Sequence, residues 1–215
     1  ASDESLLATI EVQETPSGKT LKLKSRALTN LTLKNKTSRV IISLPAHAVY
    51  SLKGNVDVGS VELLENDNIF SSISLSVDVG DIKFQAASKQ PQLKDLVVVS
   101  DIGSVFVELQ DVPMLESAQL RADVGNGTLL FNSLLSNPLH LTAGVDVGDF
   151  TIKMPKEQSA ALRFDKESFT SDIEISNLDY VQGESTYTIN GQSDIKNQIS
   201  GEIDVSIGAF KVNGN

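Results

Sequence analysis

Five aspartates are the residues of this sequence whose type and spacing could support chemistry, because each stands two residues before a glycine. The aspartates are Asp57, Asp78, Asp101, Asp123 and Asp146, and the glycines are Gly59, Gly80, Gly103, Gly125 and Gly148. Successive glycines are 21, 23, 22 and 23 residues apart. A period of this length is typical of stacked structural repeats, in which each unit buries its apolar face against its neighbours.

In a parallel stack, the five carboxylates would form a row with one residue per strand, about 4.8 Å apart. Unit charges at that distance repel each other by roughly 1 kcal/mol in bulk water, so something must offset the repulsion. We favour hydrogen bonds from backbone N–H groups at the turn, which Asp beside Gly often accepts. The less favoured alternative is that the row, with Asp81 and Asp149 across the turn, binds Ca²⁺. The spacing matches neither an EF-hand loop nor the nonapeptide calcium roll, so we expect no bound metal or cofactor.

Residues for other site chemistries are sparse. His47 and His140 are distant in sequence, and neither has a metal-binding partner at i+3 or i+4. Cysteine is absent, which excludes a disulfide framework and a thiolate metal site. Ser193 and Lys196 fit a Ser-x-x-Lys pattern, but they lie in a polar stretch rather than at the start of a helix. We therefore expect a protein that is not an enzyme.

Alternating apolar residues define the elements that position the aspartates. Every second residue from Ile73 to Val79 is apolar before Gly80, and the same alternation recurs from Leu139 to Val147. Alternation places these apolar residues on the inner face of a strand. Hydrophobic residues make up 40% of the chain but aromatic residues only 5%, so the core must consist of Val, Ile and Leu. The sequence predicts an all-β fold, namely a β-solenoid (a roll like a parallel β-helix) with rungs of roughly 22 residues.

We expect a single domain over residues 1–215. A turn at Thr15-Pro16-Ser17-Gly18 separates two alternating segments, which predicts a β-hairpin that caps the stack. Thr170-Ser171 stands where a rung should have Val-Gly. The predicted parts are the N-terminal cap and first strands (1–44), the repeat rungs (45–175), an irregular excursion (176–200) and the last rung, which closes the stack (201–215).

The repeat also resembles a known family. Leu44-Pro45 and Met154-Pro155 each precede an alternating strand, and strands end in Val-Asp-Val-Gly followed by Asp or Ser. This pattern resembles the bacterial putative-adhesin and toast-rack domains of unknown function, over roughly residues 38–212. The resemblance implies a β-roll at the cell surface or in the cell envelope, with no established catalytic residues to carry over. Thr170-Ser171 departs from the family pattern.

The charge distribution narrows the classes of partner. The net charge is −10, which argues against a binder of nucleic acid. Residues 1–50 contain 7 basic and 4 acidic residues (7 − 4 = +3), which leaves −13 for the rest. The basic residues lie in segment 19–39, which is expected to be a solvated strand face. The alternative is that this segment forms an end of the molecule that faces an anionic membrane or wall polymer. No apolar run of 18 residues exists, so we expect any membrane anchor to lie outside this chain.

The variable segments between rungs are the predicted contact surface, because loops carry recognition in repeat proteins. These segments are Leu64–Phe70, Gln85–Lys94, Asp111–Ser117 and Asn132–Pro138. We expect an exposed apolar strip there, which favours protein binding or self-association, with a cell-wall polymer as a second possible partner. The strip comprises Phe70, Pro91, Met114, Leu115, Leu134 and Leu135.

Together these observations predict a non-enzymatic, adhesin-like β-solenoid that is extracellular or belongs to the cell envelope. One alternative is a carbohydrate-active β-helix that binds or cleaves polysaccharide, in which aligned acids would bind Ca²⁺ or act as acid and base. The absence of Trp and the presence of only three Tyr argue against it. Another alternative is an extracytoplasmic sensor or spacer domain of a membrane-anchored protein.

Overall fold

The computed structural model describes residues 9–15, 18–24, 41–44, 48–64, 68–164, 170–191 and 198–215. The chain falls into two compact units, residues 1–44 and residues 45–215, and each is described by itself. All regular elements within these residues are β-strands. Accordingly, this part of the chain contains no helix that could cross a membrane.

The first unit contains one β-hairpin. β1 (Thr9–Thr15) pairs in antiparallel orientation with β2 (Gly18–Lys24), with Thr15 opposite Gly18. The hairpin is therefore confirmed, while its predicted turn residues, Pro16 and Ser17, lie outside the described residues. Its role as a cap on the stack stays a prediction.

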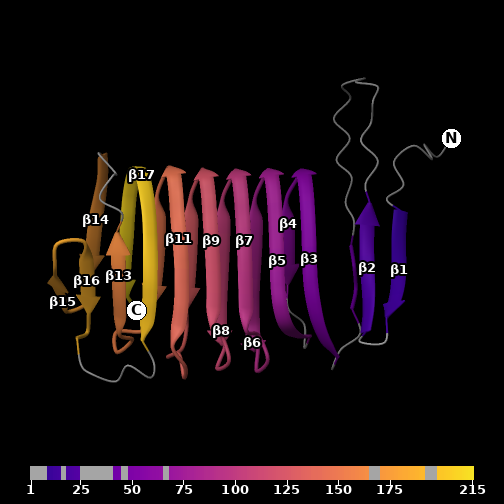
Figure 1. Cartoon of the computed structure of the whole chain (residues 1–215), viewed down its shortest axis with the longest axis horizontal. Coiled ribbons are helices and arrows are strands. Elements are labelled where there is room, and N and C mark those ends of the chain that lie inside the picture. The colour runs from indigo at the N-terminus through magenta and orange to yellow at the C-terminus, as the bar shows by residue number, and fades with distance from the viewer. Residues whose placement is uncertain are drawn as a thin grey trace. The chain divides into compact units, whose positions relative to one another are not determined.

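The second unit is built from stacked rungs, each consisting of a strand, a glycine corner and a second strand (Figure 1). The strands that lead into a corner are β3 (Val49–Val58), β5 (Ile69–Val79), β7 (Asp95–Ile102), β9 (Ser117–Val124) and β11 (Leu139–Val147). The strands that leave it are β4 (Val61–Leu64), β6 (Ile82–Lys89), β8 (Val105–Asp111), β10 (Gly127–Phe131) and β12 (Phe150–Met154). The C-terminal strands are β13 (Ala160–Phe164), β14 (Thr170–Ser176), β15 (Tyr180–Gln182), β16 (Thr186–Ile189) and β17 (Ile199–Gly214).

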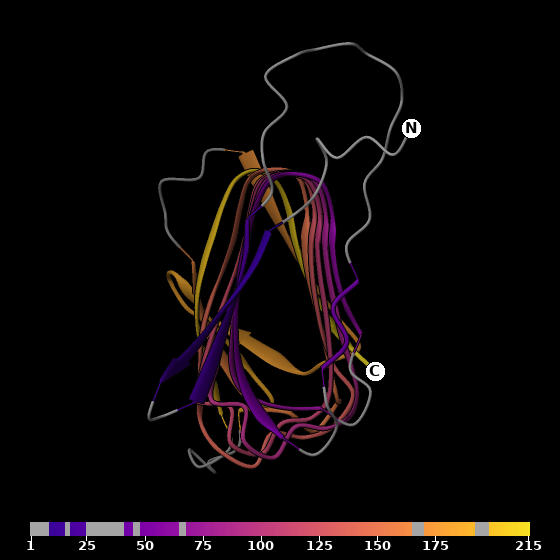
Figure 2. The ribbon, with the colours of Figure 1, turned by 90° about the vertical axis from the view of Figure 1, so that its right-hand side faces the viewer.

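Equivalent strands of successive rungs pair in parallel, so the unit has two sheet faces around one core. The entering strands follow the order β3-β5-β7-β9-β11-β17, and the leaving strands follow β17-β12-β10-β8-β6-β4. Viewed along the stack, the rungs lie over one another and bend at a shared corner (Figure 2). The all-β solenoid predicted from the repeat is confirmed.

The core is formed by the inward residues of both faces. Ile73, Leu75 and Val77 of β5 are buried, as are Ile82 and Phe84 of β6. Phe150 of β12 and Phe210 of β17 are also fully buried, and their rings stack with centroids 5.8 Å apart. Burying such side chains is worth roughly 1.5 to 3 kcal/mol each, which makes neighbouring rungs dependent on one another.

Glycine is required at the corner for two reasons. Gly103 has φ +145°, in a region that residues with a Cβ rarely adopt. In addition, a Cβ at Gly103 would overlap the carbonyl oxygen of Gly80 in the preceding rung. The backbone ladder continues on both sides of the corner, because Gly80 N donates to Ile102 O and Ile82 N donates to Ser104 O, each at 2.8 Å.

The inward–outward alternation breaks just before each glycine. Val77 is fully buried, whereas Asp78 and Val79 are both exposed. The prediction that Val79 and Val147 face the core is therefore wrong. The cause is the corner itself: the chain turns there, so the last residue of the entering strand lies on the outside of the bend.

The last strand in sequence does not end the stack. β17 lies between the rung of β11 and β12 and the outermost rung of β13 and β14 (Figure 1). The prediction that residues 201–215 close the array is therefore wrong. Ser171, which replaces the corner glycine in the outermost rung, lies opposite Gly208 of β17.

The described part of the predicted excursion (176–200) contains two short strands, β15 and β16. β16 pairs in antiparallel orientation with β13, and β15 pairs with β16. This hairpin extends the sheet beyond β13, so the entering-strand edge is covered at this end. At the other end of the sheet order, β3 contains no fully buried residue.

Candidate functional site

A continuous row of exposed apolar residues follows the glycine corner, and we call it the corner row. Its six members immediately precede the corner glycines and are 43% to 77% exposed. They are Val58, Val79, Ile102, Val124, Val147 and Ile207. The strand register places them in direct succession, with Val79 between Val58 and Ile102 and with Val147 between Val124 and Ile207.

The corner row is unlike ordinary surface exposure of single apolar residues. Six strands spaced by about 4.8 Å give a row roughly 24 Å long. Scattered exposed apolar residues need no explanation, but a contiguous apolar patch usually marks a contact surface. The sequence reasoning missed this row because it assigned the residue before glycine to the core.

Next to the corner row runs the acidic row, Asp57, Asp78, Asp101, Asp123 and Asp146. Within the described part of the chain, Asp57, Asp78 and Asp101 have no hydrogen-bond or ion-pair partner. All three are exposed, so water screens their mutual repulsion.

Backbone hydrogen bonds at the corner are made by the residue after the glycine instead. Asp81 Oδ1 accepts from Ser104 N at 2.8 Å, and Asp149 Oδ1 accepts from Ala209 N at 3.0 Å. In the rung between them, Asn126 Oδ1 accepts from Asp149 N at 3.1 Å. The favoured prediction therefore named the right type of bond but the wrong residues.

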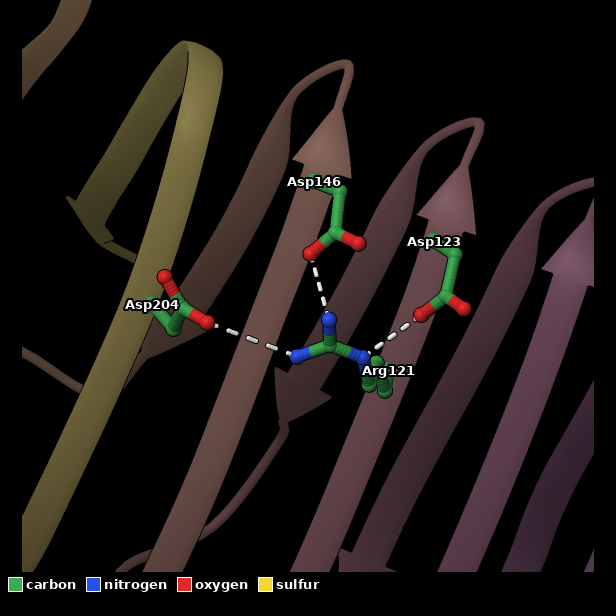
Figure 3. A network of polar contacts seen from close by, with 4 residues as sticks. All are labelled: Arg121, Asp123, Asp146 and Asp204. Atoms are coloured by element: carbon green, nitrogen blue, oxygen red, sulfur yellow. Dashed lines mark hydrogen bonds and ion pairs between the residues drawn. The ribbon is translucent and has the colours of Figure 1, made fainter. Parts of the chain in front are cut away.

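Arg121 pairs with the carboxylates at the other end of the acidic row (Figure 3). Its Nε donates to Asp123 Oδ1 at 2.5 Å, its Nη2 pairs with Asp146 Oδ1, and its Nη1 lies 3.5 Å from Asp204 Oδ2. One guanidinium thus connects β9, β11 and β17. Burial lowers the pKa of Arg121, but the hydrogen bond to Asp123 and the charges of Asp146 and Asp123 outweigh it, so the pKa lies above its usual value.

The path of Arg121 across β11 depends on a glycine. The register places Gly144 of β11 between Arg121 of β9 and Asp204 of β17. Gly144 is buried although it belongs to the outward set of its strand, which is consistent with Arg121 covering it. The sequence does hold a signal for this arrangement, because Gly144 stands one repeat of 23 residues after Arg121.

A second ion pair fixes the leaving half of β17. Lys211 Nζ lies 2.8 Å from Asp149 Oδ2. The hydrogen bond from Lys211, with a second from Ala209 N–H, holds the pKa of Asp149 below its usual value, and Asp149 in turn raises the pKa of Lys211. Polar contacts on both halves of β17 thus add to its apolar packing.

The acids do not form a metal cage in the part of the chain that the structure describes, where no three His, Cys, Asp or Glu side chains are grouped to hold an ion. Two aspartates that would be ligands in the less favoured Ca²⁺ alternative, Asp123 and Asp146, pair with Arg121. His140 lies exposed on β11, while His47, Ser193 and Lys196 are outside the described residues.

The predicted loop strip is only partly exposed. Phe70, Leu115 and Leu135 are 1% to 3% exposed, so their assignment to an exposed strip is wrong, while Met114 and Leu134 are 38% and 52% exposed. The buried leucines have a local cause. Leu115 N donates to Val112 O at 3.1 Å, so the loop closes in a tight turn that directs Leu115 under the core.

The other loops also direct side chains into the core. Pro91 is half-buried and precedes Leu93, which is fully buried. Buried glutamines brace these loops, because Gln90 Oε1 accepts from Phe70 N and Gln158 Oε1 accepts from Leu135 N, both at 2.9 Å. Loop apolar residues therefore serve mainly to close the core.

A shallow depression of about 400 Å³ lies near the C-terminal hairpin. It is lined by Lys156, Asn177, Leu178, Asp179 and Asn190. Asn177 and Asn190 have positive φ, which Asn tolerates in turns. The lining contains no aromatic ring on which a sugar could stack. The depression therefore does not favour the carbohydrate-active alternative.

Comparison with known proteins places the fold in context. No protein-family model matches the chain, and no curated protein matches its sequence significantly. A solved structure of similar fold is that of a putative cell adhesion protein from Clostridium sporogenes ATCC 15579. The two chains are 15% identical, with a TM-score of 0.53, over 100% of this chain and 79% of the other. At this identity the likeness shows a shared fold, and function must be argued from the surface.

Proposed function

We propose that this chain is a non-enzymatic, adhesin-like protein of the cell surface or cell envelope, and that its solenoid contacts protein partners along the corner row. The observation that carries the proposal is the corner row itself. Six β-branched side chains remain in water at equivalent positions of consecutive rungs. Other exposed apolar residues, such as Val49, Leu134 and Val181, do not share one repeated position, whereas these six form a row in register, which favours a contact function over a folding function.

Two further observations support the proposal. The similar solved structure is described as a putative cell adhesion protein, and the repeat resembles the putative-adhesin and toast-rack domains. The repeated spacing also suits multivalent binding, in which weak contacts of several rungs add through effective concentration.

The flanking charges indicate the chemistry of the partner. Asp57, Asp78 and Asp101 lie beside the first half of the corner row and have no ion-pair partner among the described residues. A partner surface with apolar residues and a basic rim would complement this half. Binding should therefore weaken as the salt concentration rises.

The test separates the three function classes with the parent protein. Binding is measured on immobilised collagen, fibronectin and fibrinogen and on a glycan array that includes cell-wall polymers, and polysaccharide cleavage is assayed in parallel. We expect saturable, salt-sensitive binding to protein and no cleavage. Specific polysaccharide binding with cleavage would replace the proposal by the carbohydrate-active alternative, and a lack of protein binding would favour a spacer.

A further inference from the structure

The position of β17 leads to an inference that does not depend on the corner row. β17 contains the last regular residues of the chain, yet it lies inside the sheet, with β11 and β12 on one side and β13 and β14 on the other. Without β17, these four strands would present two facing rows of unpaired backbone groups. We call the space between them the β17 slot.

β17 fills this slot along almost its whole length. On one side, residues 199–207 pair with β11 and residues 210–214 pair with β12. On the other side, residues 199–203 pair with β13 and residues 207–213 pair with β14. The slot is therefore an acceptor site for one parallel strand in a defined register.

Side chains make the fit specific. Phe210 is fully buried, stacks on Phe150 and meets Phe164 edge-on at 5.2 Å between ring centroids. On the outer surface, Asp204 pairs with Arg121 and Lys211 pairs with Asp149. A slip in register would break both ion pairs and move apolar residues to the surface.

The connection to β17 is longer than the distance it spans. Ile189 and Ile199 both lie opposite Ala160, on its two sides, so they are separated by two strand spacings, about 10 Å. The connecting residues 190–198 can extend over roughly 30 Å. This spare length would let β17 reach the slot of an adjacent molecule.

We propose that two copies of this chain exchange β17, so that the slot of each copy holds the C-terminal strand of the other. Every hydrogen bond, ion pair and ring contact of β17 is reproduced in the exchanged dimer, because the two slots are identical. The dimer is closed and two-fold symmetric. Exchange requires that two copies fold side by side, so that β17 of each copy enters the sheet of the other.

The test uses the absence of cysteine from the chain, so introduced thiols have only one another as partners. Thr142 of β11 and Glu202 of β17 are neighbours in register, and both are exposed. Thr142→Cys and Glu202→Cys are prepared as separate proteins, mixed, unfolded in urea, refolded together at high concentration and oxidised. The proposal predicts a shift from monomer to a disulfide-linked dimer that contains one chain of each variant.

A matched pair controls for random crosslinking. Gln119 of β9 lies beside Thr142 on the other side, and both residues precede the exchanged strand. A mixture of Gln119→Cys and Thr142→Cys should therefore give no mixed dimer above background. A chain carrying both Thr142→Cys and Glu202→Cys shows that the geometry permits the bond. If this chain forms its disulfide but the first mixture gives no more dimer than the control, the exchange proposal is overturned, while the proposed adhesive function would be unaffected.

Discussion

Two constraints can require glycine at the corner, namely a positive φ and the close approach of the backbone of the preceding rung. Gly103 and Gly59 differ in the second of these constraints. Both have strongly positive φ, +145° and +141°. Of these two glycines, Gly103 alone lies against the backbone of a preceding rung among the described residues, since a Cβ at Gly59 would meet no described atom closer than Val56 Cγ1 at 3.6 Å. The sequence shows the spacing of the glycines, but it does not show which of them combine a positive φ with contact to the preceding rung.

This difference predicts unequal effects of one substitution. Gly59→Ala should lower the free energy of unfolding by about 1 to 3 kcal/mol through backbone strain alone. Gly103→Ala should lower it by a further 1 to 3 kcal/mol or so, because the methyl group also forces the Gly80 carbonyl away. Urea unfolding of the two variants measures both values. Equal losses would show that contact between rungs does not constrain the corner.

On the level of strands, the sequence predicts the elements well and their order poorly. Period-2 alternation locates β5, β7 and β11 because one side of each strand is buried. It cannot place β17, because the rungs share one pattern and several stacking orders bury the same residues. It also misplaces Leu115 and Leu135, because a loop position in sequence does not reveal a turn that folds beneath the core.

Arg121 links β17 to two earlier strands through its ion pairs. Its removal should therefore lower the local stability of β17. We expect Arg121→Met to lower the free energy of unfolding by about 1 kcal/mol and to reduce the dependence of stability on salt. Lys94→Met is the control, since the Lys94–Glu116 pair is more exposed and joins neighbouring rungs only, so its loss should cost less than about 0.5 kcal/mol. Amide hydrogen exchange should quicken in β17 for Arg121→Met. Unchanged exchange in that strand would refute the role assigned to Arg121.

At the scale of the whole molecule, the repeat places one exposed apolar residue in each rung, and together these residues form a continuous surface. A single exposed valine would mean little, but the register repeats the same outward position in every rung from Val58 to Ile207. The acidic row beside it is paired with Arg121 at one end and has no described partner at the other. The sequence predicted the acidic row from its period, whereas the apolar row became visible only when the direction of the chain at the corner was known.

Whether the corner row is the contact surface is tested by comparing the binding of two variants. Val58, Val79 and Ile102 are replaced together by Ser, and the control replaces Met114, Leu134 and Val181 by Ser, since these three are also exposed but lie outside the corner row. Both proteins should keep nearly the parent melting temperature, because exposed substitutions change stability little. We expect the corner variant to bind the partner protein from the immobilised panel at least about tenfold more weakly, a loss of about 1.4 kcal/mol, while the control binds as the parent does. Parent-like binding by the corner variant would show that the corner row is not the contact surface.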